Sequence, residues 1–192
     1  MHYVQVKGIL SAKNGMNLYR GCSHGCIYCD SRSSCYQMPH AFEDIEVKQN
    51  ALVLLEEALR RKRKKCMIGT GSMTDPYIPL ETELGSVRQA MELVYKYGCG
   101  FTVLTKSDRI LRDLDLLQKI NASAKCVVQM TLTTYNEELC KKIEPYVSTT
   151  RKRFEALKQL RDAGIPTVVW LAPILPFINA ARRQPRILLP AA

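Results

Sequence analysis

Three cysteines near the amino terminus have the spacing of metal ligands. Cys22, Cys26 and Cys29 form a C-x3-C-x2-C run. A loop this short can turn three thiolates toward one soft metal centre, and both tetrahedral zinc and iron–sulfur clusters accept such ligands. Structural zinc uses four protein ligands, so zinc would require Cys35 or His24 as the fourth. Three thiolates on a cubane cluster instead leave one iron open, and the spacing favours this second interpretation without excluding zinc.

The rest of the composition favours a reducing compartment for these thiols. The chain has 192 residues, eight cysteines and a net charge of +10. No apolar run reaches the ~20 residues needed to cross a bilayer, and residues 1–15 contain no apolar core of signal-peptide length. We therefore expect a cytoplasmic protein without a membrane partner, in which most cysteines are ligands, catalysts or buried thiols. The positive charge indicates an anionic partner but does not identify it.

Strand-like and helix-like segments alternate along the chain. Short apolar runs predict strands that begin near residues 16, 66, 101, 125 and 167. Amphipathic and other helix-forming segments predict helices over Glu46–Lys65, Leu84–Tyr97, Asp108–Ile120, Glu137–Ile143 and Thr150–Ala163. This order predicts parallel βαβ units and therefore an α/β fold. In such folds the functional side chains follow the carboxyl ends of the strands, and the cysteine run stands at such a position.

The cysteine run, with Tyr28 just before its last member, resembles the signature of the radical S-adenosylmethionine superfamily. Other segments resemble the branch of that superfamily related to spore photoproduct lyase. These segments are Tyr19–Cys22 with His24, Thr74–Tyr77 with Glu81, Thr105–Ser107, Arg112–Leu117, Glu144–Pro145, Arg153 and Pro173–Pro176. The resemblance extends from about Met16 to Asn179. It implies a partial parallel (β/α) barrel in which about five of six strand–helix units are present.

The resemblance also implies a chemistry. Cys22, Cys26 and Cys29 would hold a [4Fe-4S] cluster whose open iron binds S-adenosyl-L-methionine. One electron, from a donor such as flavodoxin or ferredoxin, would cleave this cofactor to methionine and a 5′-deoxyadenosyl radical that abstracts hydrogen from a substrate. Kinship with the photoproduct lyases makes nucleic acid a candidate substrate.

Residues after the other predicted strands are candidates for cofactor binding. The turn Gly69–Ser72 could bind the methionyl amine through hydroxyls such as that of Ser72, and Lys106 could pair with the carboxylate. Gln129 and Thr131 share one face of the fourth strand and would suit the ribose. Each of these also has a plain structural interpretation, such as a solvated strand end or an outer face. The remaining candidates, from the resemblance, are Tyr28, Thr74, Arg153 and Ile174.

The end of the sequence departs from the family pattern. Residues 180–192, AARRQPRILLPAA, contain no Asp, Glu or Lys. About 20 residues follow the fifth predicted strand, which are too few for a helix and a sixth strand. We therefore expect an N-terminal segment over residues 1–15, an incomplete core domain over 16–179 and an atypical tail over 180–192 from a truncated or frameshifted gene.

The strongest charge cluster is the run RRKRKK at Arg60–Lys65. It ends a predicted helix, where cations are favoured by the helix dipole, so a solvated helix end is favoured over a phosphate contact. Because the run precedes a strand, we expect it at the opposite end of the barrel from the cysteines. Two alternatives to an active enzyme stay open: a zinc-binding module with a basic face, and an inactive cluster-binding fragment.

Overall fold

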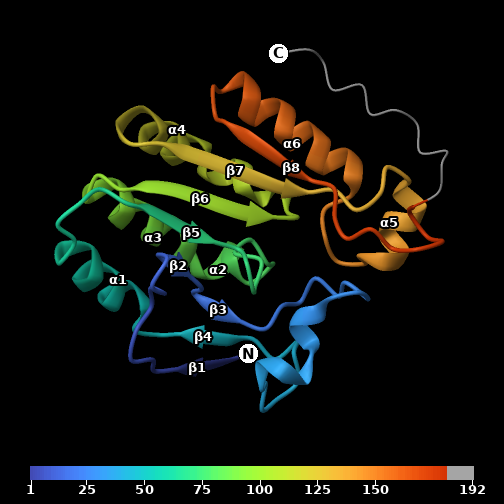
Figure 1. The fold of residues 1–192 in the computed structure, drawn as a ribbon, viewed down its shortest axis with the longest axis horizontal. Helices are drawn as coiled ribbons and strands as arrows, with labels where there is room; N and C mark the ends of the chain where they lie inside the picture. Colours follow the sequence, from blue (N-terminus) through green and yellow to red (C-terminus); the bar gives the residue numbers. More distant parts are fainter. Residues whose placement is uncertain (181–192) are drawn as a thin grey trace.

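The main sheet has five parallel strands in the part of the chain that the computed structural model describes, residues 1–180. The strand order follows the chain order, so each crossover adds the next strand to the same edge (Figure 1). The five predicted strand positions and the partial parallel barrel are thus confirmed. The strands are β2 (Gly15–Met16), β5 (Met67–Thr70), β6 (Gly100–Thr105), β7 (Cys126–Thr131) and β8 (Thr167–Trp170).

One layer of helices covers one face of this sheet (Figure 1). Its members are α1 (Ala51–Arg60), α3 (Ser86–Lys96), α4 (Leu114–Ser123) and α6 (Thr150–Asp162). Shorter helices lie in the connections, namely α2 (Glu81–Leu84), α5 (Glu137–Ile143) and three 3₁₀ helices at Asp30–Arg32, Ser34–Tyr36 and Asp108–Asp113. None of the helices described is long and apolar enough to cross a membrane.

The alternation of side chains along β7 explains why one face of the sheet is left for a site. Cys126, Val128 and Met130 are completely buried on the face that the helices cover. Burying such a side chain contributes about 1.5–3 kcal/mol, so this face fixes the register of the strand. Gln129 and Thr131 alternate with them and therefore point to the opposite face, which has no helical cover.

A second sheet lies beside the first and was not predicted. Its order is β1 (His2–Val4), β4 (Glu46–Lys48) and β3 (Tyr19–Arg20), with β1 parallel and β3 antiparallel to β4. The predicted helix over Glu46–Lys65 is therefore wrong at its start and extends too far at its end. Val47 fits the helical period of α1, but strand pairing buries it instead.

Asn50 marks the change from strand to helix. Its side chain accepts a hydrogen bond from the Val6 backbone N–H at 3.0 Å and donates one to the Val6 carbonyl at 2.8 Å. These bonds extend the contact between the two segments two residues beyond the last β1–β4 pair, and the helix begins only at Ala51. The other predicted helices have nearly the observed bounds, although the one expected from Asp108 begins as a 3₁₀ helix and becomes α4 at Leu114.

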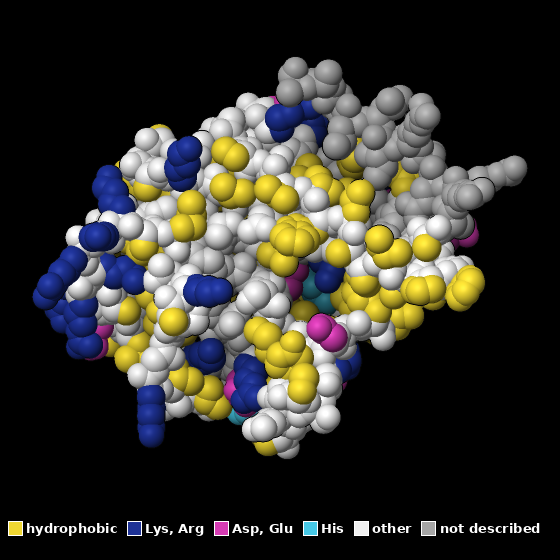
Figure 2. Space-filling view, viewed as in Figure 1, with side chains coloured by type: hydrophobic (Ala, Val, Ile, Leu, Met, Phe, Trp, Pro, Cys, Tyr) yellow, Lys and Arg dark blue, Asp and Glu magenta, His cyan; other side chains and the backbone are white. Residues whose placement is uncertain are grey.

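The basic run Arg60–Lys65 lies where α1 ends and before β5 begins. This is the amino end of β5, and the cysteines follow the carboxyl end of β3 on the other side of the molecule (Figure 1). Lys and Arg side chains gather at the left edge of Figure 2, over the end of the molecule that contains α1. The basic run is therefore remote from the cysteines.

Candidate functional site

A cavity of about 480 Å³ opens at the carboxyl ends of the parallel strands, and we call it the cysteine cavity. Cys22, Cys26 and Cys29 are among the residues that line it. The loops that follow β5 and β6, together with the ends of β7 and β8, also line it, through Gly71, Ser72, Asp75, Thr105, Lys106, Thr131, Trp170 and Pro173. Cavities of this volume accommodate small organic ligands.

The cysteine loop, residues 22–29, is held from two sides by backbone hydrogen bonds. The N–H of Cys22 donates to the Phe42 carbonyl at 3.0 Å. The N–H of Ile27 donates to the Ile143 carbonyl at 3.0 Å, at the end of α5. All eight cysteines of the chain are free thiols, and the two at positions 22 and 26 are buried. The fold thus supplies three free thiols on one short, anchored loop.

Burial determines the protonation of these thiols. It raises the pKa of Cys22 to about 12, and the nearby Asp75 carboxylate acts in the same direction. Burial also raises the pKa of Cys26 above its ordinary value. Without a cation the two side chains are therefore protonated, and a metal centre must displace their protons to bind. Metal affinity at this loop should consequently fall as the pH falls.

Asp75 joins the loops that follow β5 and β6 and also contacts the cysteine loop. It accepts hydrogen bonds from the Thr105 hydroxyl and the Lys106 N–H, both at 2.7 Å. Nδ1 of His24 lies 3.4 Å from the same carboxylate. Burial lowers the pKa of His24 and outweighs the opposing effect of Asp75, so the ring is neutral.

The other nitrogen of His24 is unpaired within the described part of the chain. Nε2 is buried, and within residues 1–180 nothing donates to it or accepts from it. Buried polar atoms of this kind are rare and call for a group that satisfies them. His24 lines the cysteine cavity, so a ligand in that cavity would supply one. The three thiols, the adjoining volume and this unsatisfied nitrogen together fit a thiolate-bound cluster with a small polar cofactor beside it.

A buried polar network connects the cysteine loop to α5 and α6. The Tyr28 hydroxyl donates to Glu144, and the Thr133 hydroxyl donates to the same carboxylate oxygen at 2.7 Å. Arg153 forms an ion pair with Glu144 and donates to the Thr131 carbonyl at 2.7 Å. Burial raises the pKa of Glu144, but Arg153 and the two hydroxyl donors outweigh it, so the carboxyl pKa lies below its ordinary value. The pair is therefore charged and fully enclosed.

Lys106 and Tyr28 meet across the cysteine cavity. Nζ of Lys106 lies 5.6 Å from the centre of the Tyr28 ring, within the range of a cation–π contact. Burial and Glu144 raise the pKa of Tyr28, so its hydroxyl keeps its proton and acts as a donor. A cation and an aromatic face thus stand together next to the cysteines.

The structure brings seven of the predicted site residues together around the cysteine cavity: Cys22, Cys26, Tyr28, Cys29, Ser72, Lys106 and Thr131. Cys35 is exposed and is not part of this lining. Both facts agree with three cysteine ligands in preference to four.

The other four predicted site residues do not line this cavity. Thr74 is buried and lines a smaller cavity of about 200 Å³. Gln129 lies on the uncovered face, but its amide donates to Thr102 at 2.8 Å and accepts from Trp170 at 2.7 Å. Arg153 is completely buried in the network with Glu144. Ile174 is 74% exposed and lines a neighbouring cavity of about 370 Å³.

Three carboxylates around the site, two of them buried, received no chemical role from the sequence. Asp75 and Glu144 are described above. Glu81 accepts hydrogen bonds from the Tyr19 hydroxyl at 2.5 Å and from Arg112 at 2.8 Å, and so fixes β3 just before the cysteines. The only signal for these residues in the sequence was their place in segments that resemble the lyase branch, because a carboxylate with a distant partner has no local pattern.

Gly71 is a position where only glycine fits, and we expect Gly71→Ala to destabilise the protein more than Gly98→Ala does. Both residues have positive φ angles, +100° and +63°. A Cβ at Gly71 would lie 1.9 Å from the Leu104 carbonyl oxygen, whereas no described heavy atom lies within 4 Å of one at Gly98. Backbone strain at a positive φ angle costs about 1–3 kcal/mol and is common to both variants. The difference between their free energies of unfolding in urea therefore measures the clash of the Gly71→Ala side chain with Leu104. Equal losses would contradict it.

Comparison with known proteins places this arrangement in a family. Residues 16–184 match the family model of the Radical SAM superfamily. The chain therefore belongs to the radical S-adenosylmethionine (radical SAM) superfamily. The cavity lined by the three cysteines lies at the carboxyl ends of the parallel strands, where ligands bind in open parallel α/β folds.

The chain is also similar in sequence to individual proteins. An uncharacterised protein of Methanocaldococcus jannaschii is 33% identical over 170 residues, which cover 88% of this chain and 62% of that protein. A radical SAM Nα-GlyT isomerase of Pseudomonas phage M6 is 24% identical over 157 residues, 82% of this chain and 32% of that protein. The chain thus spans less than two thirds of these relatives.

Solved structures of spore photoproduct lyase share the fold. One lyase structure superposes with a TM-score of 0.67 at 19% identity and covers 90% of this chain and 51% of the lyase chain. A lyase complexed with a dinucleoside spore photoproduct gives a TM-score of 0.63 at 19% identity, covering 83% and 45%. The suggested relation to the lyase branch is confirmed at the level of the fold.

Proposed function

We propose that this chain is the core of a radical SAM enzyme in which Cys22, Cys26 and Cys29 hold a [4Fe-4S] cluster and the cysteine cavity binds S-adenosyl-L-methionine. The observation that supports this most directly is the shared lining of the cavity by the three thiols and by polar groups from the ends of the strands. Superfamily membership supports the same chemistry. When bound, the reduced cluster supplies the electron that cleaves the cofactor.

The chain's own residues would bind and orient the cofactor. Lys106 provides a positive charge for the methionyl carboxylate, and the Ser72 hydroxyl and the neighbouring backbone provide acceptors for the amine. Thr131 and Tyr28 face the same space, with a hydroxyl and an aromatic ring for the ribose and the base. The unsatisfied Nε2 of His24 gives one further polar contact. The remaining predicted residues do not line the cavity and would support cofactor binding only indirectly: Thr74, Gln129, Arg153 and Ile174.

Nucleic acid is the substrate class that we propose. One solved relative in fold is a lyase complexed with a dinucleoside photoproduct. Trp170, which lines the cysteine cavity, is 48% exposed, and Tyr135, which lines the neighbouring cavity, is exposed as well. Exposed aromatic rings beside a ligand cavity stack on bases, at about 1–3 kcal/mol per base. A flavodoxin or ferredoxin would serve as the electron donor.

Anaerobic reconstitution tests the proposed function. We expect about four iron and four sulfide per chain, as three thiolates on a cubane cluster require. Dithionite with S-adenosyl-L-methionine should then release 5′-deoxyadenosine, detected by chromatography. Bound iron without 5′-deoxyadenosine would leave an inactive cluster-binding fragment. Tight binding of zinc, with an affinity that falls in Cys35→Ala, would instead support the alternative of a zinc-binding module.

A further inference from the structure

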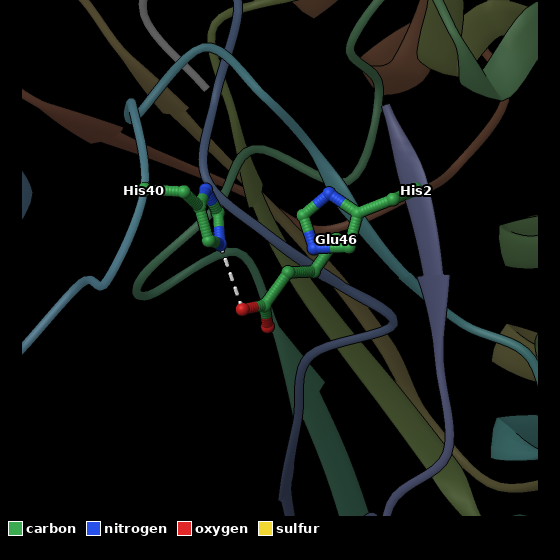
Figure 3. Close-up of side chains that lie close together, drawn as sticks. All are labelled: His2, His40 and Glu46. Carbon is green, nitrogen blue, oxygen red and sulfur yellow. Dashed lines mark hydrogen bonds and ion pairs between the residues drawn. The ribbon is translucent and has the colours of Figure 1, made fainter.

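A second group of metal-ligating side chains lies outside the cysteine cavity. His2, His40 and Glu46, which we call the histidine site, each offer one ligand atom, and these atoms all lie within 4.8 Å of one another. Figure 3 shows the two imidazole rings and the carboxylate turned toward a common point. His2 and Glu46 are direct partners in the β1–β4 register, so the strand pairing itself places them on one face. His40 comes from the loop before β4.

Each imidazole of the histidine site is oriented by an acceptor on its outer side. Nδ1 of His2 lies 2.9 Å from the Asp44 carboxylate. Nδ1 of His40 donates to the Ala41 carbonyl at 2.9 Å. In metal sites the ligating histidine almost always donates its other ring N–H to a carboxylate or a backbone carbonyl. Both rings of the histidine site have this arrangement, so Nε2 is the nitrogen of each ring that is left to act as a ligand.

The contact between His40 and Glu46 can be bridged by a proton or by a metal ion. A carbonyl oxygen only accepts, so Nδ1 of His40 bears a hydrogen, and Nε2 of the neutral ring carries a lone pair. Nε2 nevertheless lies 2.8 Å from a Glu46 oxygen (Figure 3). Either a proton or a metal ion must stand between two lone pairs at this distance. The guanidinium of Arg20, 3.8 Å from the same oxygen, is too distant to fill that place.

We infer that His2, His40 and Glu46 form a binding site for a divalent transition metal of the zinc type, separate from the cysteine cavity. Two imidazole nitrogens and one carboxylate oxygen suit zinc better than magnesium or calcium, which prefer oxygen ligands alone. Three protein ligands leave the fourth position to water. None of the three residues lines the cysteine cavity, so the inference does not depend on the proposed function.

The histidine site would fix the segment on which the cysteines stand. A bound ion would join β1, the loop before β4 and β4 itself, and β4 pairs with β3 immediately before Cys22. The Cys22 N–H already donates to Phe42 in the same loop as His40. The metal would thus act as a structural clamp on the small sheet.

Calorimetric titration with zinc chloride tests this inference. The protein should carry no polyhistidine tag and should have Cys22, Cys26 and Cys29 replaced by serine, so that the cysteine loop binds no metal. We expect one zinc per chain, with loss of binding in His40→Gln and in Glu46→Gln. Asp44→Asn should weaken binding by about 10–100-fold, because it orients His2 without ligating. Glu43→Gln, an exposed carboxylate of the same loop, is the matched control and should bind normally.

A second measurement uses the chain with its native cysteines and its reconstituted cluster. Elemental analysis should find one zinc beside the iron, and X-ray absorption at the zinc edge should show nitrogen and oxygen neighbours without sulfur. Absence of zinc binding in the folded serine variant, or equal binding in His40→Gln, would overturn the inference and leave a proton-bridged His40–Glu46 pair. Failure of cluster assembly alone would affect the proposed function and leave the histidine site standing.

Discussion

Replacing Arg153 with methionine is expected to lower the free energy of unfolding by about 3–5 kcal/mol, because it leaves Glu144 buried without its counter-charge. Arg153 is fully buried and donates to Glu144, to the Thr131 carbonyl and to the Ser148 carbonyl at 2.8 Å. Methionine fills a similar volume but donates to none of these acceptors. Urea denaturation followed by circular dichroism measures the loss.

Arg151 provides the matched control for this experiment. It is exposed on the same helix, two residues earlier, and Arg151→Met should change stability by less than about 0.5 kcal/mol. The double variant Glu144→Gln with Arg153→Met should recover part of the loss, since no charge is then left buried. A loss below about 1 kcal/mol in Arg153→Met would show that the pair is hydrated or unformed.

Replacing Cys22, Cys26 or Cys29 singly with alanine is expected to abolish the cluster and all release of 5′-deoxyadenosine. A cubane held by three thiolates loses a protein ligand in each variant, so the iron content after reconstitution should fall from about four per chain to near zero. The fold should survive, because each substitution removes only one small side chain from the loop. Iron and sulfide assays with visible absorption measure the result.

Two other cysteines serve as controls with opposite burial. Cys35 is exposed just beyond the cysteine loop, and Cys126 is completely buried in β7. Both Cys35→Ala and Cys126→Ala should keep the full iron content, although the second should lose stability. Retention of the cluster in Cys29→Ala together with its loss in Cys35→Ala would move the third ligand to Cys35.

The main sheet was predictable because its signals are local. The buried residues of β6 and β7 form short apolar runs, and each run is followed by a helix-forming segment of adequate length. The small sheet gave no such signal. Its strands are two or three residues long, and β4 continues the apolar period of α1 through Val47, so only pairing with the distant β1 distinguishes it from helix.

The residues of the site likewise divide into those with a local signal in the sequence and those without one. Cys22, Cys26 and Cys29 were predicted because ligand spacing within one loop is written directly in the sequence. The positions of Lys106 and Thr131 followed from the rule that parallel strands present their carboxyl ends together. The partners of Arg153 could not be deduced, because Arg151 and Lys152 stand beside it and burial selects one of the three through contacts with Glu144 and Thr131.

The bond from Tyr28 to Glu144 has a consequence for synthesis of the chain. The two residues are 116 positions apart. At 5–20 residues per second, the ribosome adds Glu144 roughly 6–23 s after Tyr28. During that interval the nascent cysteine loop lacks the α5 and α6 contacts that enclose it, and its thiols are open to oxidants and to free metal ions. Under the proposed function, loading of iron would compete with these reactions from the first seconds of translation, and anaerobic expression should raise the fraction of chains that receive a cluster.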